Sequence, residues 1–230
     1  MIEFSHGTNT FDNCPEQKSV KNFAEFAEWL EHNRSPKKGG NYFCAPLVAG
    51  NHSNPEKYPG TKTWRQKHLS KARAFLPFDC DSFESDDEAN NFLEFLEQFE
   101  HLWYETASST EDSPRLRAVV ALSEEVQQIQ STQIGEQLIR GFNSRYGLNV
   151  EFDRSVFNHS QPCYNPTGDN QLTHWCDAPP LNVTTFTVNQ DDQSEKQGNY
   201  ALNQILLGNS VDADPEKIAE QCLVIEKMKS

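Results

Sequence analysis

Two aspartates separated by one residue follow a short apolar run in the stretch FLPFDCDSF, residues 75 to 83. In an extended chain, alternate side chains point to the same side, so Asp79 and Asp81 would share one face while Cys80 occupies the other. Two carboxylates held this close repel each other, and one pKa rises unless a cation lies between them. The stretch therefore indicates either a solvated turn or a binding site for a divalent cation.

A third acid, Asp153, lies in the stretch VEFDRSVF and also follows a short apolar segment that we expect to be a strand. Three aspartates at strand ends, two at D-x-D spacing and one far along the chain, are the ligand set of a two-metal phosphoryl-transfer site. Such a site binds Mg²⁺ or Mn²⁺, and a triphosphate supplies the remaining ligands. Taken alone, Asp153 could equally be the capping acid of a turn or helix.

Two arginines lie between these acids, in the strand-like stretch RLRAVVALS. Arg115 and Arg117 are two residues apart, so their guanidinium groups would share one face of the strand. A basic strand face commonly meets phosphate or carboxylate groups, because the guanidinium fork binds both. An ordinary solvated edge strand is the alternative interpretation.

Positive charge is concentrated in residues 57 to 78, which contain six Lys or Arg and no acid, although the whole chain has a formal net charge of -14. This segregation predicts a groove for a nucleic-acid strand or a triphosphate, with a tryptophan on which a base stacks. The candidate residues are Trp64, Arg65, Lys67, His68, Lys71 and Arg73. A solvated basic segment is the alternative.

Three segments, FDCDSF, TASSTEDSPRLRAVVALSEEV and FDRSVFNHSQPCYNP, occur in this order. Their order resembles that of the archaeo-eukaryotic primase superfamily, in particular the primase-polymerase domains carried by phages, plasmids and other mobile elements. The resemblance covers roughly residues 40 to 170. It implies an RNA-recognition-motif-like core beside a smaller α/β unit, and primer synthesis or strand extension from NTPs or dNTPs on a single-stranded DNA template.

The resemblance also implies roles for individual residues. The metal ligands and catalytic acids would be Asp79, Asp81 and Asp153, and the nucleotide-binding residues would be Ser109, Arg115, Arg117, Ser160 and Gln161. The second motif departs from the family pattern, because Ser109 stands where relatives have a histidine. A serine can form a hydrogen bond with a phosphate oxygen but brings no positive charge, which puts nucleotide affinity in question.

Composition limits the cellular setting. Six cysteines without paired spacing in a chain of 230 residues favour a reducing cytoplasm. The resemblance to proteins of phages and plasmids implies that this cytoplasm is that of a bacterial host. No stretch approaches the roughly 18 apolar residues of a membrane span, and the first residues do not have the pattern of a signal peptide. Cys163, His174 and Cys176 fit structural zinc spacing poorly, so zinc is not expected.

Hydrophobic periodicity predicts helices over residues 19–33, 85–102 and 124–147, and strands over 41–49, 75–80, 102–108, 115–123, 149–153 and 182–188. Alternating helices and strands without a repeat indicate an α/β or α+β fold in which helices cover a mixed sheet. We expect a catalytic domain over residues 1–190. Residues 191–230 read as a linker and a helical segment, similar to the segment that precedes a helicase module in such proteins.

Two other functions remain open from the sequence. The first is a catalytically silent nucleotide-binding or nucleic-acid-binding module with a primase-like fold, which the missing histidine and the acidic composition favour. The second is a metal-dependent nuclease, since acids and a lysine can also cleave phosphodiesters. The usual P-D…(D/E)-x-K nuclease pattern is not visible in the sequence.

Overall fold

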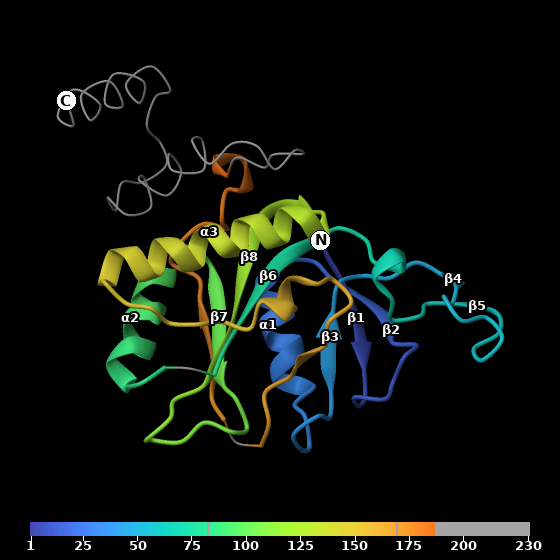
Figure 1. Ribbon diagram of the computed structural model, residues 1–230, viewed down its shortest axis with the longest axis horizontal. Coiled ribbons are helices and arrows are strands. Elements are labelled where there is room, and N and C mark those ends of the chain that lie inside the picture. Colours follow the sequence, from blue (N-terminus) through green and yellow to red (C-terminus); the bar gives the residue numbers. More distant parts are fainter. Residues whose placement is uncertain (82, 169, 187–230) are drawn as a thin grey trace.

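The computed structural model describes residues 1–81, 83–168 and 170–186, so the predicted linker and helical segment at 191–230 lie outside the described residues (Figure 1). The described part is an α+β protein, as predicted, with two four-stranded sheets and one two-stranded sheet. The prediction of a mixed sheet is wrong, because every pair of neighbouring strands in the described part is antiparallel.

The central sheet has the strand order β10-β7-β8-β6. Its strands are β6 (Arg73–Cys80), β7 (His101–Glu105), β8 (Leu116–Val126) and β10 (Leu172–Trp175). The long strand β8 pairs with β6 on one side and with β7 on the other, and its register places Arg117 opposite Asp79. Because side chains alternate across a strand, this register puts the predicted acidic and basic residues on the same face of the sheet.

Two helices, α2 (Asp86–Leu96) and α3 (Gln128–Tyr146), cover one face of the central sheet (Figure 1). Ser85 caps α2 by accepting a hydrogen bond from the Glu88 N–H, and three acids in the first turn suit the helix dipole. Gly147 ends α3 in the left-handed conformation that glycine adopts readily. Helix α3 begins later than predicted, because Glu124, Glu125 and Val126 extend β8.

Phenylalanines dominate the core under these helices. Phe78 of β6, Phe92 of α2 and Phe142 of α3 are all buried, and the Phe92 and Phe142 ring centroids are 5.2 Å apart. Each such side chain contributes about 1.5 to 3 kcal/mol when it leaves water. This core packs against the helix-covered face of the β6–β8 pair, and it holds in place the end of β6 where the two aspartates lie.

The opposite face of the central sheet packs on helix α1 (Phe23–His32) and on the second sheet. That sheet has the order β2-β1-β3-β9, with β1 (Ile2–Gly7), β2 (Glu16–Val20), β3 (Tyr42–Cys44) and β9 (Cys163–Tyr164). Phe26 of α1 stacks on Phe75 of β6 and meets Phe43 of β3, which joins the two sheets. The predicted strand over 41–49 ends early, and Pro46 has no N–H to donate to a ladder.

A short hairpin of β4 (Gly50–Asn51) and β5 (Thr61–Lys62) forms an arm, residues 50–66, that projects from the body (Figure 1). A 3₁₀ turn (Lys67–Leu69) links this arm to β6. The first half of the predicted basic stretch therefore lies on the arm, and the second half leads into the centre of the fold.

Two predicted strands are wrong. The chain before Asp153 is irregular, and Asp153 caps the 3₁₀ helix η2 (Arg154–Phe157). Residues 182–186, the described part of the last predicted strand, contain the 3₁₀ helix η3 (Val183–Thr185) with Asn182 as its cap. In both places the side-chain oxygen accepts the N–H two residues on, a local bond that competes with strand pairing. Within the described residues, no helix has the length and apolar character needed to cross a membrane.

Candidate active site

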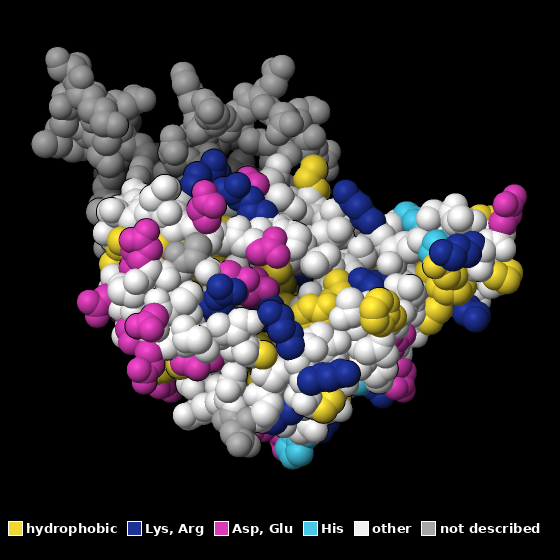
Figure 2. All heavy atoms as spheres, turned by 60° about the horizontal axis from the view of Figure 1, so that its bottom comes forward, with side chains coloured by type: hydrophobic (Ala, Val, Ile, Leu, Met, Phe, Trp, Pro, Cys, Tyr) yellow, Lys and Arg dark blue, Asp and Glu magenta, His cyan; other side chains and the backbone are white. Residues whose placement is uncertain are grey.

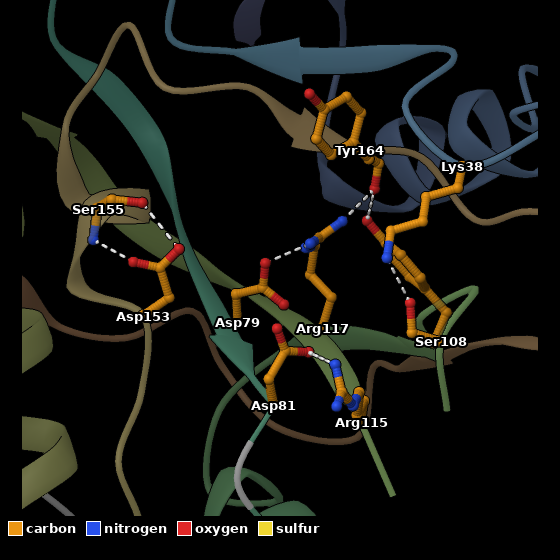
Figure 3. Close-up of polar contacts among 10 residues, drawn as sticks. Lys38, Asp79, Asp81, Ser108, Arg115, Arg117, Asp153, Ser155 and Tyr164 are labelled. Atoms are coloured by element: carbon orange, nitrogen blue, oxygen red, sulfur yellow. Dashed lines mark hydrogen bonds and ion pairs between the residues drawn. The ribbon is translucent and has the colours of Figure 1, made fainter. Parts of the chain in front are cut away.

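The two aspartates of FDCDSF lie at the end of β6, as the two-residue period predicts (Figure 3). Cys80, between them, is fully buried in the core on the helix-covered side. Asp79 is largely enclosed, with 14% of its side chain exposed, whereas Asp81 is exposed just beyond the strand. The buried phenylalanines beneath β6 therefore set the position of this carboxylate pair.

Each predicted arginine faces one of these aspartates. Arg117 of β8 donates a hydrogen bond to Asp79 Oδ2 and a second, of 2.7 Å, to the main-chain oxygen of Tyr164. Arg115 Nη1 lies 3.8 Å from Asp81 Oδ1. Arg117 is 8% exposed, so this guanidinium is held rigidly, whereas Arg115 has room to turn. Figure 2 shows the face where β6 ends, with acidic and basic side chains side by side near its middle.

Asp79 carries an unsatisfied oxygen in this cluster. Its Oδ1 is buried and has no hydrogen-bond partner among the described residues. Burial raises the pKa of the Asp79 carboxyl, Arg117 opposes the rise, and the carboxylates of Asp81 and Asp153 add to it. A buried carboxylate oxygen without a donor, beside two further carboxylates, has the chemistry of a divalent-cation ligand. Asp79 Oδ1 could therefore act as one ligand of a divalent cation such as Mg²⁺ or Mn²⁺.

Asp153 reaches the cluster through the main chain. Its N–H donates a hydrogen bond of 2.9 Å to the Asp79 carbonyl oxygen, so the irregular segment lies along the outer edge of β6. Its carboxylate accepts hydrogen bonds from the Ser155 N–H and hydroxyl, both of 2.8 Å. Within the described ranges, no three His, Cys, Asp or Glu side chains already converge on one point as metal ligands.

A cavity of about 100 Å³ opens beside the acids. Its wall includes Arg117 of β8, with Asp81 and Arg115 at the ends of the central strands, Tyr164 from β9 and Lys38 from the loop after α1. Three cationic side chains and two acidic ones, Asp81 and Glu105, line this small cavity, and the cations would suit an anionic group such as a phosphate. Sequence reasoning missed Lys38, which comes from a loop of the other layer, and selected Ser160 and Gln161 instead of Tyr164 from the loop after Asp153.

The other predicted nucleotide-binding residues do not line this cavity. Ser109 Oγ accepts a hydrogen bond of 3.1 Å from the Arg115 N–H, so it shapes the turn before β8. Ser160 bonds the Asn158 side chain, and the Gln161 N–H bonds the Asn158 carbonyl oxygen. The serine that lines the cavity is Ser108, one residue before the position that sequence reasoning selected.

Two predictions about the basic stretch are wrong. Trp64 is 6% exposed because His52 and Tyr58 pack on its ring, so it cannot serve as an open stacking surface. Arg73 is 1% exposed inside the fold, where Nη2 bonds the Val156 carbonyl oxygen and burial lowers the pKa to about 9. Arg73 is the first residue of β6 and its side chain points into the fold, where it is enclosed despite its charge.

The remaining basic residues have different surroundings. Arg65 donates to the main-chain oxygens of Thr10 and Asp12, which ties the arm to the body. Lys71 pairs with Glu3. Lys67 and His68 are exposed beside the arm, and they are the two residues of the predicted set that most resemble an open binding surface.

The residues weighed as zinc ligands lie in different places. Cys163 is buried in β9, His174 Nε2 lies 3.2 Å from Glu100 Oε1, and Cys176 is exposed.

No protein-family model, curated protein or solved structure matches this chain.

Proposed function

We propose that the protein is a metal-dependent nucleotidyltransferase, a primase-polymerase that makes or extends strands on single-stranded DNA during replication of a mobile element. One observation carries the proposal. Asp79 and Asp81 lie at the end of β6, Arg117 of β8 and Arg115 just before it face them, and the buried Asp79 Oδ1 is left without a donor. Carboxylates for metal beside cations for phosphate are the two halves of a phosphoryl-transfer site.

The arrangement of elements supports an RNA-recognition-motif-like core. The order β6, α2, β7, β8, α3 is the start of a β-α-β-β-α-β unit, and β8 lies between β6 and β7. The Asp153 segment then runs beside β6, where the last strand of such a unit would lie. In this chain that segment is irregular, and β10 pairs on the far side with β7.

The roles of the side chains follow from their surroundings. Asp79, Asp81 and Asp153 would hold Mg²⁺ or Mn²⁺, whose chemistry is activation of an attacking hydroxyl and neutralisation of the departing pyrophosphate. Arg117 is already fixed by Tyr164 and β8, so it can neutralise a phosphate without reorganising. Arg115 lies 3.8 Å from its aspartate and can turn from it toward an anion in the cavity. The DNA template, the NTP or dNTP and a helicase module as partner belong to this proposal, as does a bacterial cytoplasm.

The proposal is tested by incubating the whole chain with single-stranded template, labelled NTPs or dNTPs and Mg²⁺ or Mn²⁺, with and without a primer. We expect incorporation by the parent chain and none by the Asp79→Ala/Asp81→Ala variant. A matched control, Glu111→Ala/Asp112→Ala, removes two exposed acids from the neighbouring loop and should keep activity. Incorporation by the Asp79→Ala/Asp81→Ala variant at the parent rate would refute the site.

A second candidate is a silent nucleotide-binding or nucleic-acid-binding module. The observation in its favour is the Arg117–Asp79 ion pair, which occupies one oxygen of the central carboxylate. The two functions separate in the same assay, because a silent module would bind nucleotide or template without incorporating label. Shortening of the labelled template instead of extension would indicate a nuclease.

A further inference from the structure

The loop between α1 and β3 brings a lysine across to the candidate active site (Figure 3). Lys38 Nζ donates a hydrogen bond of 2.8 Å to Ser108 Oγ, on the loop between β7 and β8. The two residues are 70 positions apart, and both line the cavity beside Asp81, Arg115 and Arg117. Through this contact the loop after α1 meets the β7–β8 loop at the wall of the cavity.

The loop is shaped so that Lys38 points to this place. Ser35 Oγ donates to the Lys37 carbonyl oxygen over 2.7 Å, and the Gly40 N–H donates to the same oxygen over 3.1 Å. Gly39 adopts a φ of 72°, which glycine reaches without strain. The turn therefore holds the Lys38 main chain in one position while its side chain stays exposed.

The electrostatic position of Lys38 differs from that of the two arginines. Arg115 and Arg117 each face an aspartate, whereas Lys38 forms no ion pair within the part of the chain that the structure describes. Its hydrogen bond is with a neutral hydroxyl. An ammonium group at a cavity wall without a carboxylate partner is available to a phosphate, and exchanging a hydroxyl for a phosphate oxygen gains a charge-assisted bond.

We propose that Lys38 is a further phosphate-binding residue of this site. Its ammonium group would leave Ser108 and bind the phosphate groups of an incoming nucleoside triphosphate. This inference rests on the proposed function, and it names a cation that none of the three motifs contains. It also bears on the second motif, where Ser109 brings no charge. Lys38 supplies that charge from the other layer of the fold.

The test measures nucleotide affinity by calorimetry in the whole chain with Mg²⁺, using ATP and dATP and the matching monophosphates. We expect Lys38→Ala to weaken triphosphate binding about tenfold, which corresponds to about 1.4 kcal/mol, and to change monophosphate binding far less. Lys38→Arg keeps the charge and should stay within about threefold of the parent. Lys37→Ala is the matched control, because Lys37 is also exposed but does not line the cavity.

Three results would overturn the inference: equal triphosphate affinities for Lys38→Ala and Lys37→Ala, an equal loss for triphosphate and monophosphate, or no measurable triphosphate binding by the parent chain. The equal loss would indicate a purely structural role for the lysine. The inference and the proposed function can fail separately. Triphosphate binding that depends on Lys38, without any incorporation, would refute the primase-polymerase and leave the phosphate site standing.

Discussion

A buried histidine at the junction of both sheets should make folding stability depend on pH. His159 is 1% exposed, and its Nδ1 lies 2.8 Å from the Lys71 carbonyl oxygen, which can only accept. The proton is therefore on Nδ1, and Nε2 accepts the Ser131 hydroxyl over 2.8 Å. Both nitrogens are used by the neutral ring, and protonation of Nε2 would reverse its hydrogen bond with Ser131 and place a positive charge in a buried site.

The size of the effect follows from the pKa. Burial, with the nearby charge of Arg73, lowers the pKa of His159 to about 3 from the usual 6.5. Between these two pKa values, His159 binds a proton in the unfolded state but not in the folded state. The free energy of unfolding therefore falls as pH drops below 6.5 and levels off near pH 3. The total loss of unfolding free energy at low pH is about 5 kcal/mol, at about 1.36 kcal/mol for each pKa unit. Between pH 7.5 and 5.5 the loss is about 1.4 kcal/mol.

Urea unfolding of the parent and of His159→Asn at pH 7.5 and 5.5 measures the loss of folding stability that His159 causes. Asparagine cannot take up the proton, so the stability advantage of the parent should shrink by about 1.4 kcal/mol at the lower pH. His32→Asn, at an exposed position of α1, is the control and should leave that difference nearly constant. A parent advantage that is the same at both pH values would show that His159 is not held neutral by its surroundings.

Three further outcomes are expected. Arg117→Ala should weaken nucleotide binding by about 1.5 to 3 kcal/mol in calorimetry, and Ser109→Ala should weaken it less, because an ionised donor binds phosphate more strongly than a hydroxyl does. Equal losses of binding free energy for the two variants would contradict this. Lys67→Ala should lower single-strand affinity and reduce the slope of affinity against salt in an anisotropy titration, and an unchanged slope would remove it from the interface. Gly135→Ala should destabilise helix α3 by about 1 to 3 kcal/mol in thermal unfolding, although alanine is the better helix former, because the new Cβ would lie 2.3 Å from Phe157 Cζ.

Local sequence patterns predicted those features of the site that follow from the conformation of a single strand. The two-residue period placed Asp79 and Asp81 on one face with Cys80 in the core, and the same period placed Arg115 and Arg117 toward them. The helix predicted over 85–102 begins where its acidic first turn indicates, although it ends at Leu96 and β7 begins at His101. These features need only the local conformation, which a short stretch of sequence determines.

The rest of the site depends on contacts between distant segments. Asp153 was expected at the end of a strand, but the Ser155 N–H and hydroxyl bind its carboxylate and favour a 3₁₀ turn. A D-x-S pattern after an apolar segment was the signal for that turn. Burial of Trp64 and Arg73 depends on which elements pack over them, and this packing cannot be predicted from the local charge pattern. Lys38 reaches its partner across 70 residues of chain.

The hydrogen bond from the Asp153 N–H to the Asp79 carbonyl oxygen links two main-chain positions 74 residues apart. The separation of these two acids is thus set by the backbone and not by the side chains themselves. Replacing either carboxylate would leave this main-chain hydrogen bond in place, so the backbone around the two positions would keep its arrangement without the charges. Proline at position 153 would have the opposite effect, since it would remove the N–H while leaving the first two acids untouched.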